Sequence, residues 1–105
     1  MAAKRIDARD LPDSPLDAAA AFSVRIVPAV RQAAGSHCVV MFDHADHTHQ
    51  AWRRSMVEEL AREAAPARVN GIVGADVSAV EDVIAYLEGA PGITGQVLEV
   101  ARVKA

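Results

Sequence analysis

Segments with a helical hydrophobic period alternate along the chain with short apolar runs. In three segments the apolar residues recur every three or four positions, as on one face of a helix: residues 16–34, 48–65 and 79–88. Asp76 or Ser78 is the expected cap of the third segment, and Gly89 its end. Each is followed by a predicted strand. The runs 37–42 and 68–74 are typical of strands that are covered on both faces, and residues 95–103 are predicted to form an edge strand. This alternation predicts a parallel sheet with right-handed crossovers. We therefore expect an α/β fold with three layers, about three parallel strands and three helices.

The ends of the first helix carry recognisable signals. Ser14 and Pro15 suit its first turn, and Gly35 suits its end. Pro28 lies inside the helix, where a missing N–H is expected to bend it at a cost of about 3 kcal/mol. The preceding residues, 1–15, are polar and are predicted to be an N-terminal arm, with residues 16–105 forming the domain.

The composition predicts a single domain with a thin core. The chain has 105 residues, of which 51% are hydrophobic but only 4% aromatic. A core built from alanine, valine, isoleucine and leucine buries little area per residue. Such a domain often gains stability by covering an apolar face with a second subunit, so we expect an oligomer.

Charge and cysteine content exclude several classes of function. The net charge is −3 and there is no run of lysine or arginine, which argues against nucleic-acid binding. No apolar stretch is long enough to span a membrane. The single cysteine, Cys38, excludes an internal disulfide and suits a cytoplasmic protein. Because it lies inside the run "HCVVMF", Cys38 is predicted to be a core residue.

Three stretches resemble motifs of a known family. They are "PAVRQAAGSHCVVMF", "EELAREAAPARVNGIVG" and "VEDVIAYLEGAPGITGQVLEV". In this order and near this spacing they resemble the carboxyl-terminal half of a short-chain dehydrogenase/reductase, over about residues 16–101. The resemblance implies half of a doubly wound, Rossmann-like sheet, without the glycine-rich turn through which the family binds its nicotinamide cofactor.

The family's catalytic residues have no counterpart in this chain. Where the family has a serine at the end of a strand, this chain has Phe42 and Asp43. The family's tyrosine and lysine positions fall near Asp46 and Gln50, and the only tyrosine, Tyr86, lies on a later helix. A carboxylate and an amide cannot replace a phenol and an ammonium group. We therefore expect no bound cofactor, no catalytic residue and no enzymatic activity of the chain alone.

The retained half suggests a role in assembly. In family members, the helices corresponding to residues 16–34 and 48–65 pack against their copies in a partner. We expect a non-catalytic subunit, structural or regulatory, that associates through this helix pair with itself or with a full-length reductase. An alternative is that the chain contributes to a composite reductase active site in a complex. The predicted interface residues are Phe22, Ile26, Val30, Trp52, Met56 and Leu60.

Two further expectations concern the neighbouring residues. Without earlier strands, the run 37–42 should have an unpaired edge, which invites pairing. On the second helix, the charged face is predicted to be solvated or to form the rim of an interface. Its residues include Arg53, Arg54, Glu58 and Glu59.

A cluster of histidines and aspartates follows the run 37–42. Its members are Asp43, His44, Asp46, His47 and His49. They lie at the carboxyl end of a predicted parallel strand, where α/β folds bind ligands, and their types suit zinc. One alternative is therefore a small metal-binding protein or metalloenzyme that uses Asp43, His44 and His47. The spacing matches no known metal motif, so we favour a polar turn in which Asp46 or Thr48 caps a helix; a pH-sensitive contact is a third possibility.

Overall fold

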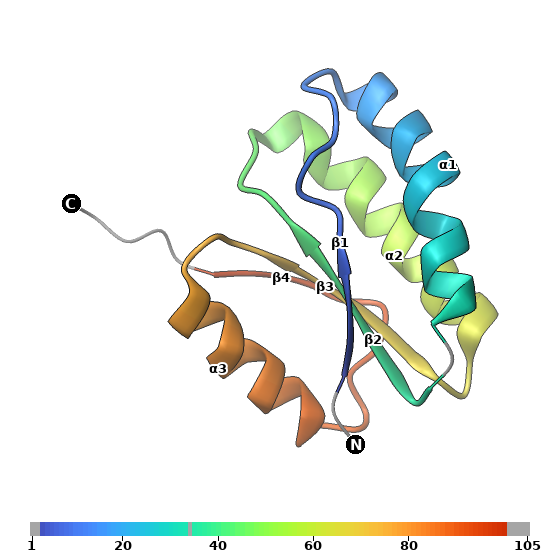
Figure 1. Ribbon diagram of the computed structural model, residues 1–105, viewed down its shortest axis with the longest axis vertical. Helices are drawn as coiled ribbons and strands as arrows, with labels where there is room; N and C mark the ends of the chain where they lie inside the picture. Colours follow the sequence, from blue (N-terminus) through green and yellow to red (C-terminus); the bar gives the residue numbers. More distant parts are fainter. Residues whose placement is uncertain (1–2, 34, 101–105) are drawn as a thin grey trace.

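The computed structural model describes residues 3–33 and 35–100. Four strands and three α-helices alternate along this part of the chain, with one short 3₁₀ helix, η1 (His47–His49), before the second α-helix (Figure 1). The strands are β1 (Lys4–Asp7), β2 (His37–Phe42), β3 (Arg68–Val73) and β4 (Val97–Glu99). The α-helices are α1 (Pro15–Gln32), α2 (Gln50–Ala64) and α3 (Val77–Glu88). Residues 101–103, expected to extend the last strand, lie outside the described residues.

All four strands are parallel and lie in chain order, β1-β2-β3-β4. The predicted α/β class is therefore confirmed, with four strands in the described residues instead of about three. The additional strand, β1, lies within the predicted arm and pairs with β2 from Lys4↔Cys38 to Asp7↔Met41, so the expected unpaired edge of β2 is wrong. Its sequence, "KRID", gives little strand signal because β1 is an edge strand, and edge strands often carry charges.

Helices cover both faces of the sheet, as a three-layer fold requires. Phe42 and Val40 of β2 belong to the core on one face, with residues of α1 and α2. Val39 and Met41, which alternate with them along the strand, belong to the core on the other face, with Ile84 of α3. This alternation explains why β2 reads as one continuous apolar run, since successive side chains point to opposite faces and both faces are buried.

The third crossover differs in hand from the first two. At each crossover the chain advances to the next strand in the same direction across the sheet, but α1 and α2 lie on one face and α3 on the other (Figure 1). A helix on the opposite face reverses the hand of its βαβ unit. The prediction that the crossovers are right-handed therefore cannot hold for all three, although right-handed units are strongly preferred.

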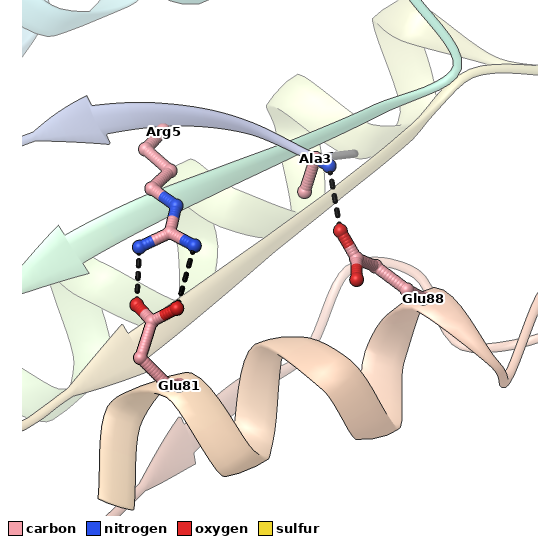
Figure 2. Close-up of polar contacts among 4 residues, drawn as sticks. All are labelled: Ala3, Arg5, Glu81 and Glu88. Atoms are coloured by element: carbon pink, nitrogen blue, oxygen red, sulfur yellow. Dashed lines mark hydrogen bonds and ion pairs between the residues drawn. The ribbon is translucent and has the colours of Figure 1, made fainter. Parts of the chain in front are cut away.

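Polar contacts connect α3 with β1. The α3 helix follows β3 along the chain, and β1 lies two strands away from β3 in the sheet. The guanidinium of Arg5 forms a two-pronged ion pair with the carboxylate of Glu81, in which Nη2 lies 2.9 Å from Oε1 (Figure 2). The backbone N–H of Ala3 donates to Glu88 Oε2 over 2.9 Å. Both contacts are exposed, so they orient α3 across the sheet more than they stabilise the fold.

The predicted interface residues lie mostly inside the single chain. Phe22, Ile26, Val30 and Leu60 are each no more than 6% exposed and pack against the sheet. Trp52 and Met56 are partly buried against the same core. The inward faces of α1 and α2 thus form the core of the domain, and only the outward faces are available to a partner. The α1 helix continues through Pro28.

Candidate functional site

The segment after β2 turns into a helix through Asp46. Its Oδ1 accepts a hydrogen bond from the backbone N–H of Thr48 at 2.9 Å and another from the Thr48 hydroxyl. These bonds from the Thr48 side chain and backbone hold the pKa of Asp46 below its ordinary value. The predicted capping role of Asp46 is therefore confirmed, and its carboxylate is an acceptor in this turn.

His49 is a structural residue of the same segment. Its side chain is buried between the chain ahead of α1 and the start of α2, at 7% exposure. The indole N–H of Trp52 donates to His49 Nδ1 over 2.9 Å, and His49 Nε2 lies 2.8 Å from the carbonyl oxygen of Asp13. Since Nδ1 accepts, Nε2 carries the proton and donates to Asp13. Both ring nitrogens are therefore engaged within the protein.

The remaining candidates for a metal site are not brought together. His44 Nδ1 lies 3.4 Å from Glu99 Oε2 of β4, whereas the His47 side chain is exposed. Within residues 3–33 and 35–100, no three His, Cys, Asp or Glu side chains are placed so that they could hold a metal ion. The structure thus does not place Asp43, His44 and His47 around one possible metal position.

Arg53 was missed by the sequence interpretation, which placed it on the solvated face of α2. It is only 8% exposed. Its guanidinium carbon lies 4.7 Å from the ring centroid of Phe42, and Nη1 donates to the carbonyl oxygen of Asp43 over 2.8 Å. The sequence contained a signal for this burial, because Arg53 lies one helical turn before the buried Val57 and therefore on the same face of α2. The buried face of α2 is thus rotated by about one residue from the stripe of Trp52, Met56 and Leu60.

The positions that correspond to the family's catalytic residues also lie at this end of the sheet. Phe42 is fully buried in the core, and Gln50 is the exposed first residue of α2. Tyr86 is 60% exposed on α3, which covers the other face. Burial raises the pKa of the Cys38 thiol to about 11, so this thiol is inert at neutral pH.

A second candidate surface is the outward side of the α1–α2 pair. A shallow groove of about 390 Å³ runs between the helices, lined by Val27, Met56 and Leu60 together with charged side chains of both helices. Beside it, Leu16 and Val24 of α1 are 84% and 75% exposed. None of the helices in the described residues is long and apolar enough to cross a membrane.

Comparison with known proteins places the chain in a family. A family model described as short chain dehydrogenase-like protein matches residues 6–100. No curated protein and no solved structure gives a significant match. The matched region begins within β1, at Ile6, and extends past the end of β4, so it includes the other three strands and all three α-helices. The chain therefore belongs to the short chain dehydrogenase-like family.

Proposed function

We propose that this chain is a non-catalytic subunit that associates with a second copy of itself through the outer helix face. This face consists of Leu16, Ala20, Val24 and Val27 of α1 together with Met56 of α2. The observation that carries the proposal is the exposure of Leu16 and Val24, at 84% and 75%, on one side of a single helix. Leu16, Ala20 and Val24 are spaced by four residues and so form a continuous stripe.

The stripe can supply a modest driving force for association. Complete burial of a leucine or valine side chain contributes about 1.5 to 3 kcal/mol, and a symmetric dimer would bury Leu16 and Val24 from both copies. The loss of translational and rotational freedom opposes this by at least about 4 kcal/mol. We therefore expect a concentration-dependent equilibrium between monomer and dimer.

The charges around the stripe are compatible with a second copy. The exposed charged residues along the groove and the outward side of α2 are Arg31, Arg54, Arg62, Glu58, Glu59 and Glu63. Three positive and three negative groups leave no net charge to repel an identical partner. The ion pair of Arg31 with Glu63, at 2.7 Å and 2.9 Å, joins the two helices across the groove.

The absence of activity in the isolated chain is supported by the chemistry at the carboxyl edge of the sheet. Near the family's tyrosine position stands Asp46, whose pKa is lowered by its hydrogen bonds from Thr48. It is ionised at neutral pH and has no proton to donate. A reduced-nicotinamide absorbance assay should find equal, background rates for the purified chain and its Asp46→Asn variant. Turnover that copurifies with the chain and is lost in the variant would contradict this part of the proposal.

Light scattering coupled to size exclusion tests the association. Val24 and Val77 are both valines at 75% exposure, on α1 and α3 respectively, so they form a matched pair. We expect a dimer fraction that grows with concentration for the unmodified chain and for Val77→Glu, and only monomer for Val24→Glu. An unmodified chain that stays monomeric at all concentrations would overturn self-association and direct the search to a full-length reductase partner.

A further inference from the structure

A buried polar atom at the carboxyl edge of the sheet has no hydrogen-bond partner among the described residues. It is Arg53 Nε. His44 Nδ1 also makes no hydrogen bond, but it lies 3.4 Å from the Glu99 carboxylate. Unsatisfied buried polar groups are rare in folded proteins and each needs a reason. One reason is a ligand that supplies the partner.

The hydrogen bonding of Arg53 leaves one edge of its guanidinium free. Among the described residues its only hydrogen bond is made by Nη1, at 2.8 Å to Asp43 O, and it takes part in none of the ion pairs. Nε and Nη2 remain, and they carry two parallel N–H groups on the same edge of the planar group. This edge matches the two oxygens of a carboxylate. The guanidinium carbon lies over the rings of Phe42 and Trp52, 4.7 Å and 5.8 Å from their centroids.

A small cavity lies beside Arg53 and has both polar and apolar walls. Its volume is about 100 Å³, which holds several water molecules and suits a ligand of a few heavy atoms. Arg53 and Gln50 contribute polar groups to the wall, and Val73 and Val97 contribute apolar ones. Such a lining favours a ligand with one polar end and a short hydrocarbon body.

Nearby carboxylates limit the charge that the ligand can carry. Asp46 and Glu99 line the same cavity, and the charges of Asp43 and Glu99 act on Arg53. Arg53 and Arg54 line it as well, so two cations balance two carboxylates before a ligand binds. A monocarboxylate would leave one net negative charge at the site, and a dianion would leave two. The lining therefore favours a monoanion over a phosphate dianion or a dicarboxylate.

We propose that Arg53 binds the carboxylate of a small monocarboxylic acid, whose hydrocarbon part lies against Val73 and Val97. The site is distinct from the outer helix face and does not depend on association. It would give the chain a ligand-binding function beyond that of a docking subunit.

Titration followed by backbone amide NMR shifts tests this site with defined probes. We expect saturable shifts centred on residues 43–54 with butyrate, and none with butanamide, which has the same shape without the charge. Succinate and inorganic phosphate should bind at least about tenfold more weakly than butyrate. Absence of saturable shifts with butyrate, or tighter binding of phosphate, would overturn the proposal.

Three variants locate the site. Arg53→Met should weaken butyrate binding by about tenfold or more because it removes both donors. Arg62→Met, at an exposed residue of the same helix that does not line this cavity, should change it by less than about twofold. Val97→Trp fills the cavity and leaves Arg53 in place, so it should also abolish binding if Arg53→Met fails to fold by circular dichroism. Binding that survives Val97→Trp with unchanged affinity would contradict the assignment.

Discussion

Polar side chains are buried at both ends of the parallel sheet, but their hydrogen bonding differs between the two ends. At the amino end, Asn70 is fully buried and engages His37 Nε2, the carbonyl oxygen of Ile93 and the backbone N–H of Gln96. Arg68 Nη1 lies within 3.2 Å of three carbonyl oxygens at the end of α3 and in the following loop. At the carboxyl end, Arg53 Nε has no hydrogen-bond partner in the part of the chain that the structure describes.

This difference separates polar groups that fix the fold from polar groups that are available for binding. The amino-end cluster connects the first residues of β2 and β3 with the loop that leads into β4, and so holds the chain where the third crossover returns to the sheet. Satisfied networks of this kind stabilise one arrangement, and partly satisfied ones do not. We therefore expect substitutions to affect mainly stability at the amino end and mainly binding at the carboxyl end.

Replacement of Asn70 should have the largest effect on stability. Asn70→Ala removes the partners of the Gln96 N–H and the Ile93 carbonyl inside the protein, and we expect a loss of about 3 kcal/mol in unfolding free energy. Urea unfolding measures it. Gln96→Ala is the matched control, because it removes an exposed amide side chain and leaves the Gln96 backbone donor in place. Equal losses in both variants would show that the buried network is not the cause.

The same substitution at two arginines compares the two ends directly. Arg68→Met removes the donor to three carbonyl groups and should cost about 2 kcal/mol. Arg53→Met replaces a buried cation that makes no ion pair within residues 3–33 and 35–100 with an apolar side chain of similar length. Its effect should stay within about 1 kcal/mol. Urea unfolding of both variants gives the comparison. A larger loss for Arg53→Met than for Arg68→Met would reverse the roles assigned to the two ends.

Acid should weaken the amino end through His37. Burial, with the neighbouring charge of Arg68, lowers the pKa of His37 below 6.5, and Glu88 opposes this only in part. The unfolded chain then binds more protons than the folded one between the two pKa values, so His37 is expected to reduce stability as the pH falls below about 6.5. His37→Gln should remove this part of the pH dependence, and His47→Gln, at an exposed position, should not. Unfolding curves from pH 7 to pH 5 that have the same slope for all three proteins would contradict the role of His37.

The exposed contacts between β1 and α3 should matter least. Arg5→Ala breaks the pair with Glu81, both of whose side chains are 47% exposed, and should hardly change global stability. Faster amide hydrogen exchange in α3 is the expected result, because the helix loses a contact that orients it. Arg31→Ala, which breaks the comparable pair with Glu63, should leave exchange in α3 unchanged. Equal exchange rates in α3 for Arg5→Ala and the unmodified chain would exclude the orienting role.

The parts of the fold that can be predicted from the sequence are those in which burial determines the positions of the hydrophobic residues. The runs around Val39 and Ile72 are apolar because both faces of the sheet are covered, and the spacing of Phe22, Ile26 and Val30 follows from one buried helix face. β1 was missed because an edge strand with a single apolar side chain leaves almost no pattern. The change of hand at the last crossover was missed because periodicity does not report on which face of the sheet a helix packs.

The candidate sites were harder to predict for a related reason. Phe22 and Leu60 were assigned to an interface because an apolar stripe has the same spacing whether it covers the protein's own sheet or another subunit. Arg53 was placed in solvent because charged residues usually are. Its burial depends on the rings of Phe42 and Trp52, which come together only in the folded protein.

Cross-linking through an introduced cysteine tests most directly whether the outer helix face joins two copies. Ser23 is exposed beside the stripe of Leu16, Ala20 and Val24, whereas Asp82 is exposed on α3. The native Cys38 is buried, with its pKa raised to about 11, so it should remain silent under mild oxidation. We predict that Ser23→Cys forms a disulfide-linked dimer and that Asp82→Cys and the unmodified chain do not. If Ser23→Cys cross-links no faster than Asp82→Cys, the outer helix face is not where two copies meet.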